Sequence, residues 1–406
     1  FFAKKCCRTN YLVRQPPDGR RENVRWFLFV PLLTLRKGGF MKNFGFGFMR
    51  LPFQDDAVDM ELVKRMVDAF MENGFTYFDT AYKYCRGLSE PTLKEALVDR
   101  YPRDSYVLTT KLSNEFMHSR EEQEEVFEDQ LNRLGCGYFD YYLLHNQGAV
   151  NYQVSLELDS FAFVRQKKEE GKIRHIGISF HDKAELLDEI LTAHPEIEVV
   201  QLQINYLDWD NESIQSRRCY ETARRHGKPV IVMEPVKGGT LVNLPKEAEQ
   251  LFRDYAPDAS NASWALRFAA SHEGVMMVLS GMNSMEQMED NIRTMKDFQP
   301  MNGEELRICA EAAKVIQANL TIPCTGCSYC TVQCPKHIPI PEYFALFQHG
   351  YMTTQMVYYY NLTQNHPKAG DCVRCHQCEK HCPQHIEITN HLQEISEKFD
   401  GFQGWR

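Results

Sequence analysis

Positive charge is scarce in this sequence once its first forty residues are set aside. The chain has 46 lysine and arginine residues against 55 aspartate and glutamate residues, which gives a net charge of −9. Residues 1–40 contain nine basic and two acidic residues, so the rest of the chain carries a net charge of −16. A body with this balance repels the phosphate backbone of nucleic acids. We therefore expect no nucleic-acid partner.

A long hydrophobic run is missing from the first forty residues as well. The apolar stretch there, "WFLFVPLLTL", has ten residues, whereas a transmembrane helix needs about 20. An arginine pair precedes it as in a twin-arginine export signal, but no small-residue cleavage site follows. The first methionine is Met41. We expect residues 1–40 to be an unstructured or non-native extension, and we expect no membrane association.

A disulfide framework is also lacking, although the chain has 14 cysteines. Eight of them fall in two closely spaced motifs, and the other six are scattered along the chain. This usage is typical of a reducing compartment, so we expect a cytoplasmic protein. A hydrophobic content of 43% with 25% charged residues indicates a globular chain with a sizeable core.

From Met41 onward, short apolar runs alternate with amphipathic stretches. Eight such pairs predict a closed (β/α)8 TIM barrel over residues 41–300, an α/β fold. The first helix is expected within residues 57–74, with Gly74 at its C-terminal cap. The expected strands are residues 44–51, 76–81, 105–112, 139–146, 174–179, 199–206, 229–236 and 275–281.

Ionisable side chains follow three neighbouring strands of this predicted barrel. Asp79, Lys111 and His145 stand at strand ends, and Tyr84 follows Asp79 by five residues. Each alone has a plain structural interpretation, as a turn residue, a surface lysine or a packed aromatic. Together at one rim they suggest acid–base chemistry, in which Lys111 lowers the pKa of Tyr84, Asp79 holds Lys111, and Tyr84 donates a proton to a forming alkoxide.

These residues lie in the segments "FDTAYKY", "LTTKL" and "DYYLLHN", which resemble the Asp, Tyr, Lys, His tetrad segments of the aldo-keto reductases. The resemblance covers about residues 43–297. It implies a catalytic tetrad of Asp79, Tyr84, Lys111 and His145 and reduction of an aldehyde or ketone with NADP or NAD. Members of the family that reduce carbon–carbon double bonds carry Glu in place of this His, so His145 favours a small carbonyl substrate.

The same resemblance implies where the nicotinamide cofactor binds. Ser179 and Gln201 are expected near its amide, and the turn after the eighth strand with the following helix near its phosphate and adenosine. Loops after strands seven and eight are also suited to anions on physical grounds, because glycines there let the backbone approach a phosphate. Preference between NADPH and NADH stays open, since Gly281, Met282 and Gln287 stand where many relatives have basic residues. The expected phosphate and adenosine contacts are Lys237, Gly238, Gly281, Asn283, Gln287, Asp290 and Asn291.

The C-terminal part of the chain contains two C-x2-C-x2-C-x3-C motifs, each followed by proline. A tetrahedral zinc site uses four ligands in two pairs and would leave cysteines over, whereas two 4Fe-4S clusters use them all. By the rule for two-cluster ferredoxins, the fourth cysteine of each motif ligates the other cluster. We expect a linker helix at 301–323 and a small, mainly helical ferredoxin-like domain at 324–406. The expected ligands are Cys324, Cys327, Cys330, Cys334, Cys372, Cys375, Cys378 and Cys382.

Aldo-keto reductases with such an appendage form a recognisable subgroup of largely anaerobic bacteria, and the chain resembles that subgroup. Two functions are compatible with its parts. The first is a carbonyl reductase whose clusters serve electron transfer or structure. The second is an electron-transfer or redox-regulatory protein, with a redox partner protein, whose barrel binds nucleotide with little turnover. Clusters pass single electrons whereas nicotinamide accepts a hydride, and no flavin motif that could couple them is recognised.

Overall fold

A computed structural model describes the chain from Lys42 to Phe402 with short gaps. The residues outside this description are 1–41, 56, 115–116, 213, 320–321, 323, 325, 327, 349–351, 383–384 and 403–406. The predicted N-terminal extension and the proposed ligand Cys327 are therefore among the residues on which the structure gives no information.

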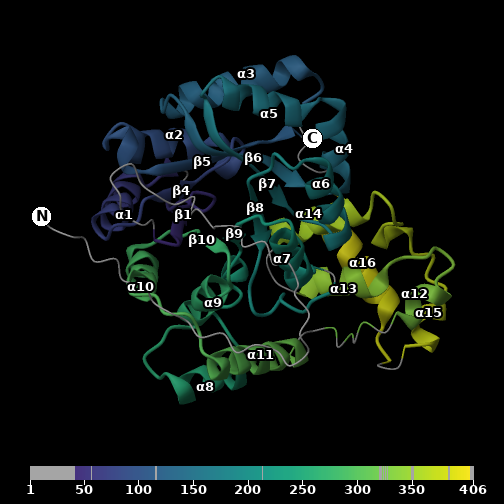
Figure 1. The fold of residues 1–406 in the computed structure, drawn as a ribbon. Helices are drawn as coiled ribbons and strands as arrows, with labels where there is room; N and C mark the ends of the chain where they lie inside the picture. Colours follow the sequence, from purple (N-terminus) through teal and green to yellow (C-terminus); the bar gives the residue numbers. More distant parts are fainter. Residues whose placement is uncertain are drawn as a thin grey trace, which may run out of the picture. The chain divides into compact units, whose positions relative to one another are not determined.

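Eight parallel strands form the centre of the described structure (Figure 1). They are β1 (Phe44–Gly47), β4 (Tyr77–Asp79), β5 (Val107–Leu112), β6 (Phe139–Gln147), β7 (Ile173–Phe180), β8 (Val199–Gln203), β9 (Val230–Met233) and β10 (Val275–Ser280). Their order around the sheet is β1-β10-β9-β8-β7-β6-β5-β4, and β1 also pairs with β4, which closes the barrel. The prediction of a (β/α)8 barrel is confirmed.

The strands are rich in branched and aromatic residues and are buried on both faces, as parallel strands covered by helices must be. At two positions inside the barrel only glycine fits, because a Cβ would lie too close to neighbouring side chains. A Cβ at Gly45 would lie 2.7 Å from Leu279 Cδ2, and a Cβ at Gly177 would lie 2.5 Å from Leu143 Cδ2. Larger residues would therefore push neighbouring strands apart.

Helices surround the barrel. They are α1 (Met60–Glu72), α2 (Ser89–Leu93), α3 (Arg120–Leu134), α4 (Ala149–Glu157), α5 (Ser160–Glu169), α6 (Ala184–Ala193), α7 (Ser216–Arg225), α8 (Lys246–Tyr255), α9 (Asn261–Ala270), α10 (Met285–Lys296) and α11 (Gly303–Ala318). Short turns of other helical types are η1 (Tyr84–Gly87), η2 (Lys94–Val98), η3 (Arg103–Ser105), η5 (Lys237–Gly239) and η6 (Ala369–Asp371).

The first helix differs in one respect from its prediction. A small antiparallel hairpin, β2 (Phe53–Gln54) with β3 (Ala57–Val58), occupies the segment where the predicted helix was to begin. The Asp59 side chain accepts a hydrogen bond from the Leu62 N–H and starts α1 instead. At the other end, Gly74 has φ of 78° and its N–H donates to Met71 O, which confirms the predicted glycine at the helix terminus.

The C-terminal module is mainly helical, as predicted. Its helices are α12 (Tyr329–Gln333), α13 (Ile340–Gln348), α14 (Met352–Leu362), α15 (Gln377–Lys380) and α16 (Ile388–Phe399). They enclose a small apolar core of their own, to which Ile214 of the barrel also belongs. Helix α11, by contrast, packs its apolar face into the core of the barrel, and Arg267 Nη1 lies 2.7 Å from Glu305 Oε1 there.

None of the helices in the described parts of the chain has the length and apolar character needed to span a bilayer.

Candidate active site

Asp79 and Lys111 form a buried ion pair at the carboxyl ends of two adjacent strands. Strands β4 and β5 bring them together, and Lys111 Nζ lies 2.7 Å from Asp79 Oδ1 and 2.8 Å from the Thr80 carbonyl oxygen. Gln201 lies on β8, across the barrel from β4, and its Nε2 donates to Asp79 Oδ2 at 3.3 Å. The ammonium is thus fixed by Asp79 and Thr80, and Gln201 in turn holds Asp79, as is required of a group that orients another side chain.

Tyr84 lies above this pair in an unusual turn. Lys111 Nζ is 4.7 Å from the centroid of its ring. The next residues, Cys85 and Arg86, have φ of 51° and 58°, and Gly87 has φ of 83°. Left-handed conformations in residues with a Cβ cost of the order of 1–2 kcal/mol each. The backbone after Tyr84 is therefore held in a strained turn that sets the direction of the phenol.

The Tyr84 phenol is held neutral. Burial raises the pKa of Tyr84 above its ordinary value of 10.0, although the Lys111 ammonium and its hydrogen bond act in the opposite direction. The sequence predicted that Lys111 lowers this pKa; its influence has that sign, but burial is larger. For Lys111, burial acts to lower the pKa, yet the charge of Asp79, the interaction with Tyr84 and the hydrogen bonds to both together outweigh it, and the pKa is raised. A charged lysine beside a protonated phenol is a donor arrangement.

His145 stands beside Tyr84 at the end of β6. The two rings meet edge-on with centroids 5.8 Å apart, and His145 Nδ1 lies 2.8 Å from Ser113 Oγ. Burial, with smaller contributions from Lys111 and His181, lowers the pKa of His145 well below 6.5. The imidazole is therefore neutral at neutral pH. When Ser113 donates to Nδ1, the proton resides on Nε2, which can then donate to a carbonyl oxygen.

Tyr84, His145 and Gln201 line a cavity of about 290 Å³. Its other lining residues are Met49, Lys83, Cys85, Arg86, Asn146, His181, Met233, Glu234, Thr354 and Val357. Four of these, Cys85, Arg86, Asn146 and Glu234, have φ between 50° and 58°. Strained backbone of this kind is concentrated at functional sites, where the surrounding structure holds it.

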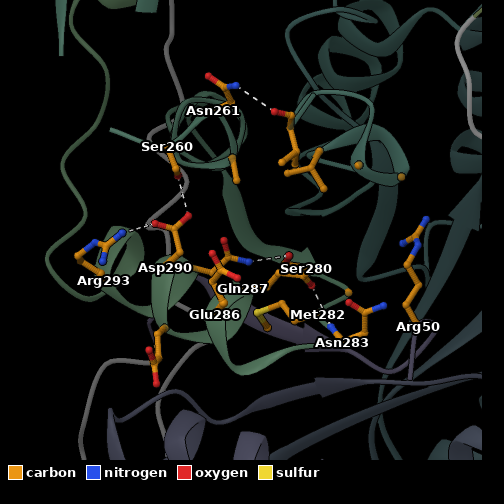
Figure 2. Close-up of a pocket in the computed structure, with 18 residues that line it drawn as sticks. Arg50, Ser260, Asn261, Ser280, Met282, Asn283, Glu286, Gln287, Asp290 and Arg293 are labelled. Atoms are coloured by element: carbon orange, nitrogen blue, oxygen red, sulfur yellow. Dashed lines mark hydrogen bonds and ion pairs between the residues drawn. The ribbon is translucent and has the colours of Figure 1, made fainter. Parts of the chain in front are cut away.

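A second cavity of about 840 Å³ lies where β10 leads into α10 (Figure 2). Gly238 and Gly239 contribute to it from the loop after β9, and Ser260 from the start of α9. The Ser284 side chain caps α10 by accepting from Gln287 N. Predicted contact residues Gly281, Asn283, Gln287, Asp290 and Asn291 all line this cavity.

A sequence model described as the aldo/keto reductase family matches residues 43–314, about two thirds of the chain. The chain belongs to the aldo/keto reductase family. A second model, described as a 4Fe-4S dicluster domain, matches residues 323–387. The barrel and the cysteine motifs thus correspond to separate families, as their different chemistry predicted.

Relatives of this aldo/keto reductase include other oxidoreductases. The chain is 24% identical over 258 residues to an uncharacterised oxidoreductase of Bacillus subtilis, which covers 56% of this chain and 80% of that protein. It is 28% identical over 207 residues to the NADH-specific methylglyoxal reductase of Escherichia coli, over 47% of this chain and 59% of the relative. Among solved structures, the holo form of an aldo-keto reductase from Bacillus halodurans has a TM-score of 0.56 and 27% identity, covering 68% of this chain and 93% of that one.

Three residues expected at the cofactor are committed to partners within this reductase. Gln201 bonds to Asp79, as described, and Ser179 Oγ accepts from Asn146 N at 2.8 Å. Lys237 is buried, and its Nζ lies 2.6 Å from Asp208 Oδ1, whereas the neighbouring Gly238 lines the larger cavity. The sequence suggested that the Lys237 ammonium contacts a phosphate. In the structure Lys237 instead forms a buried ion pair with Asp208 and does not line the cavity.

An ion pair connects the two cavities. Arg50 Nη2, from the loop after β1, lies 3.1 Å from Glu234 Oε1, from the loop after β9. Arg50 lines the larger cavity and Glu234 the smaller one. Sequence reasoning missed both residues, because neither stands in a motif and their separation of 184 positions is bridged only by closure of the barrel.

His181 is another residue of the site that stands in no recognised sequence motif. It follows β7, lines the smaller cavity, and its Nδ1 is buried without a hydrogen-bond partner among the described residues. Burial, together with the Lys111 charge, lowers the pKa of His181 to about 4. A second neutral imidazole therefore lies beside His145.

The described residues of the two cysteine motifs share a pattern of left-handed backbone positions. Positions two, four and thirteen after the first cysteine of each motif are left-handed: Gly326, Ser328 and His337 in the first, and Arg374, His376 and His385 in the second. The N–H of His337 donates to Cys334 O at 2.9 Å, and that of His385 to Cys382 O at 3.1 Å. Turns of this kind direct backbone N–H groups into a concave loop, as at many phosphate and Fe–S sites.

Six of the motif cysteines contribute to the module's core. Cys330, Cys334 and Cys378 are buried in it, Cys324, Cys372 and Cys382 pack against it, and Cys375 is exposed. Among the described side chains, no three cysteines, histidines or acidic residues come close enough to hold a metal ion. The thiol donors, their spacing and the repeated loops nevertheless fit iron–sulfur chemistry.

Proposed function

We propose that this chain is a nicotinamide-dependent carbonyl reductase in which Tyr84 donates the proton. The observation that carries the proposal is the Asp79–Lys111 pair beneath the neutral Tyr84 phenol, beside a cavity that His145 also lines. A small aldehyde or ketone in this cavity would meet two donors, the Tyr84 hydroxyl and the His145 imidazole. A cytoplasmic location is in keeping with a reducing cofactor.

The nicotinamide supplies a hydride to the carbonyl carbon when it is bound. As negative charge grows on the carbonyl oxygen, the Tyr84 O–H bond breaks and its proton passes to that oxygen, which leaves an alcohol and a tyrosinate. Lys111 stabilises the tyrosinate, and Asp79 keeps Lys111 charged and in place. The tyrosinate then recovers a proton from solvent. His145 orients the carbonyl oxygen.

The cofactor is proposed to extend from Gln201 and Ser179 to the larger cavity. Its adenosine would lie against α10 and its phosphates near Gly238 and the start of that helix, where backbone N–H groups and the helix dipole favour anions. The Arg50–Glu234 pair would then lie along the middle of the cofactor, between the two cavities.

We propose NADH as the preferred cofactor on the charge of the larger cavity. Its described lining includes the carboxylates Glu286, Glu289 and Asp290 and the guanidiniums of Arg50 and Arg293. Arg293 is paired with Asp290 (Figure 2) and Arg50 with Glu234. A 2′-phosphate would therefore meet excess negative charge and guanidiniums already engaged with carboxylates.

Replacing Gln287 with Arg tests this preference. We expect the wild-type protein to bind NADH more tightly than NADPH, and Gln287→Arg to strengthen NADPH binding by about tenfold, the value of one charge-assisted hydrogen bond. Calorimetric dissociation constants for both nucleotides check it. Gln250→Arg on α8 is the matched control. Tighter wild-type binding of NADPH than of NADH would contradict the preference.

The cysteine motifs are proposed to hold two 4Fe-4S clusters with crossed ligation. Cys324, Cys327, Cys330 and Cys382 would bind one cluster, and Cys372, Cys375, Cys378 and Cys334 the other. In support, α12, which carries Cys330, packs against α15, which carries Cys378, so the two motifs meet in one core.

Replacement of Cys382 by Ala distinguishes crossed from separate ligation. With crossed ligation, the change should disturb the cluster held by the first motif, and the variant should lose about half of its iron and sulfide. Analysis after anaerobic purification, with paramagnetic resonance of Cys324→Ala and Cys372→Ala as references, checks this. The spectrum of Cys382→Ala should match that of Cys324→Ala; a match to Cys372→Ala would contradict crossed ligation. Cys136→Ala in the barrel should keep all of its iron.

An anaerobic assay with both nucleotides and a panel of aldehydes and ketones tests the proposed reaction as a whole. Oxidation of reduced nucleotide that depends on the carbonyl compound is the expected result. Bleaching of the clusters by a reduced partner protein, without any such turnover, would instead favour the electron-transfer function.

A further inference from the structure

The pocket around Tyr84 is not made by the barrel alone. Thr354 and Val357, which line it, belong to α14 of the C-terminal module. We propose that α14 is the substrate-facing wall of this pocket and that Val357 and Thr354 determine which carbonyl compounds fit. This inference rests on the proposed reductase function and adds to it a source of specificity.

One face of α14 is fixed to the barrel. Thr354, Val357, Tyr358 and Asn361 follow one another at intervals of three, one and three positions, which places them on one side of the helix. Asn361 Nδ2 donates to the His181 carbonyl oxygen at 3.2 Å, and the Tyr358 ring meets the His181 ring edge-on at 5.6 Å. The helix therefore holds a defined register against the loop after β7.

The contact is close enough to require glycine on the barrel side. A Cβ at Gly148, the residue before α4, would lie 2.5 Å from Asn361 Nδ2. The Asp182 carboxylate, which accepts from Ala149 N at 2.9 Å, lies 3.2 Å from the same Cβ position. Both sides of the contact are thus shaped to fit one another.

The remaining side of α14 belongs to the module. Tyr359 is buried there, with ring centroids 4.7 Å from Tyr343 on α13 and 5.2 Å from Phe399 on α16. Its hydroxyl accepts from Ala369 N at 2.8 Å, three residues before Cys372. One helix therefore joins the module's core to the pocket.

The chemistry of the wall indicates the class of substrate. Val357 and Thr354 are each 8% exposed and present methyl groups to a cavity whose other apolar residues are Met49 and Met233. The proton donors, Tyr84 and His145, come from the barrel. A compact carbonyl compound would place its oxygen on the barrel side and its apolar body against α14, so the bulk of that body is what Val357 limits.

Two substitutions of opposite volume at Val357 test the proposal in the full-length protein with its clusters. Val357→Trp should lower kcat/KM for a bulky aldehyde such as 2-naphthaldehyde by about tenfold or more relative to propanal, since one methylene in an apolar pocket is worth about 10–200-fold. Val357→Ala should change the ratio in the other direction. Leu362→Ala, on the same helix but packed on the module core, is the control and should leave the ratio unchanged.

Ligand-observed NMR of the same two aldehydes, with oxidised nucleotide present, measures binding without turnover. If the wild-type protein binds aldehydes but reduces none, the proposed reaction fails, and selective weakening of 2-naphthaldehyde binding in Val357→Trp would still support the wall. Equal ratios in both Val357 variants and in Leu362→Ala would overturn the wall whether or not turnover is seen. Absence of both binding and turnover would overturn both proposals.

Discussion

Tyr84→Phe should lower kcat for every carbonyl substrate by about 10²–10⁴-fold, the usual value of one general acid. The substitution removes only the hydroxyl, and the ring keeps its contact with the Lys111 ammonium and its edge-on contact with His145. Nucleotide binding should therefore stay within about twofold, because the phenolic proton is used only as charge develops on the substrate oxygen. Steady-state kinetics and calorimetry on the same preparation check both parts.

Tyr82→Phe is the matched control for this change. Tyr82 lies two residues earlier and donates to Asp129 Oδ2 at 2.9 Å, outside the cavity lining. We expect the control to keep normal turnover. The pH profile adds a second measurement: because burial raises the pKa of Tyr84 above 10.0, kcat should not fall through loss of this proton between pH 7 and 9. Normal turnover by Tyr84→Phe would show that another group is the donor.

Lys111→Met should have the largest effect on stability. The side chains of Lys111 and Asp79 are 0% and 4% exposed, so the substitution leaves a carboxylate buried without its counter-ion. Removing one partner of a buried pair costs about 3–5 kcal/mol. We expect that loss in the free energy of unfolding, together with loss of turnover. Urea denaturation measures the loss of stability, provided that the slope of the unfolding free energy against urea concentration stays unchanged.

The double variant Asp79→Asn with Lys111→Met separates the two effects. Removing the orphaned charge should restore much of the stability, whereas turnover should stay lost because nothing then stabilises a Tyr84 anion. Lys94→Met is the control for a surface pair: Lys94 and Asp99 are 37% and 49% exposed, and such pairs contribute about 0–1 kcal/mol. Recovery of activity in the double variant would show that Lys111 has no role in the reaction.

Local pattern accounts for what could be predicted from the sequence. The strands are short apolar runs bounded by turns, and Asp79, Lys111 and His145 stand at strand ends, so barrel closure alone brings them together. The cysteine spacing likewise indicates iron–sulfur ligation without reference to the rest of the fold. These features depend on neighbours in the sequence or on one rule of the fold.

The rest depends on contacts that no local pattern encodes. Lys237 stands in a glycine-rich turn that suggested a phosphate contact, but its partner Asp208 comes from the segment after β8. The left-handed turn after Tyr84 uses Cys85 and Arg86, residue types that do not indicate positive φ. Thr354 and Val357 line a pocket of the barrel, but they belong to the segment that matches the 4Fe-4S dicluster family.

The contact between α14 and the barrel also has a consequence for biosynthesis. His181 leaves the ribosome well before Thr354, and at about 5–20 residues per second the interval between them is on the order of 10–30 s. The last barrel strand, β10, ends at Ser280, so in the final part of that interval the barrel strands are complete but the pocket lacks one wall. A nascent chain therefore exposes its acid–base residues to solvent until the cysteine-rich module has been synthesised and folded onto them.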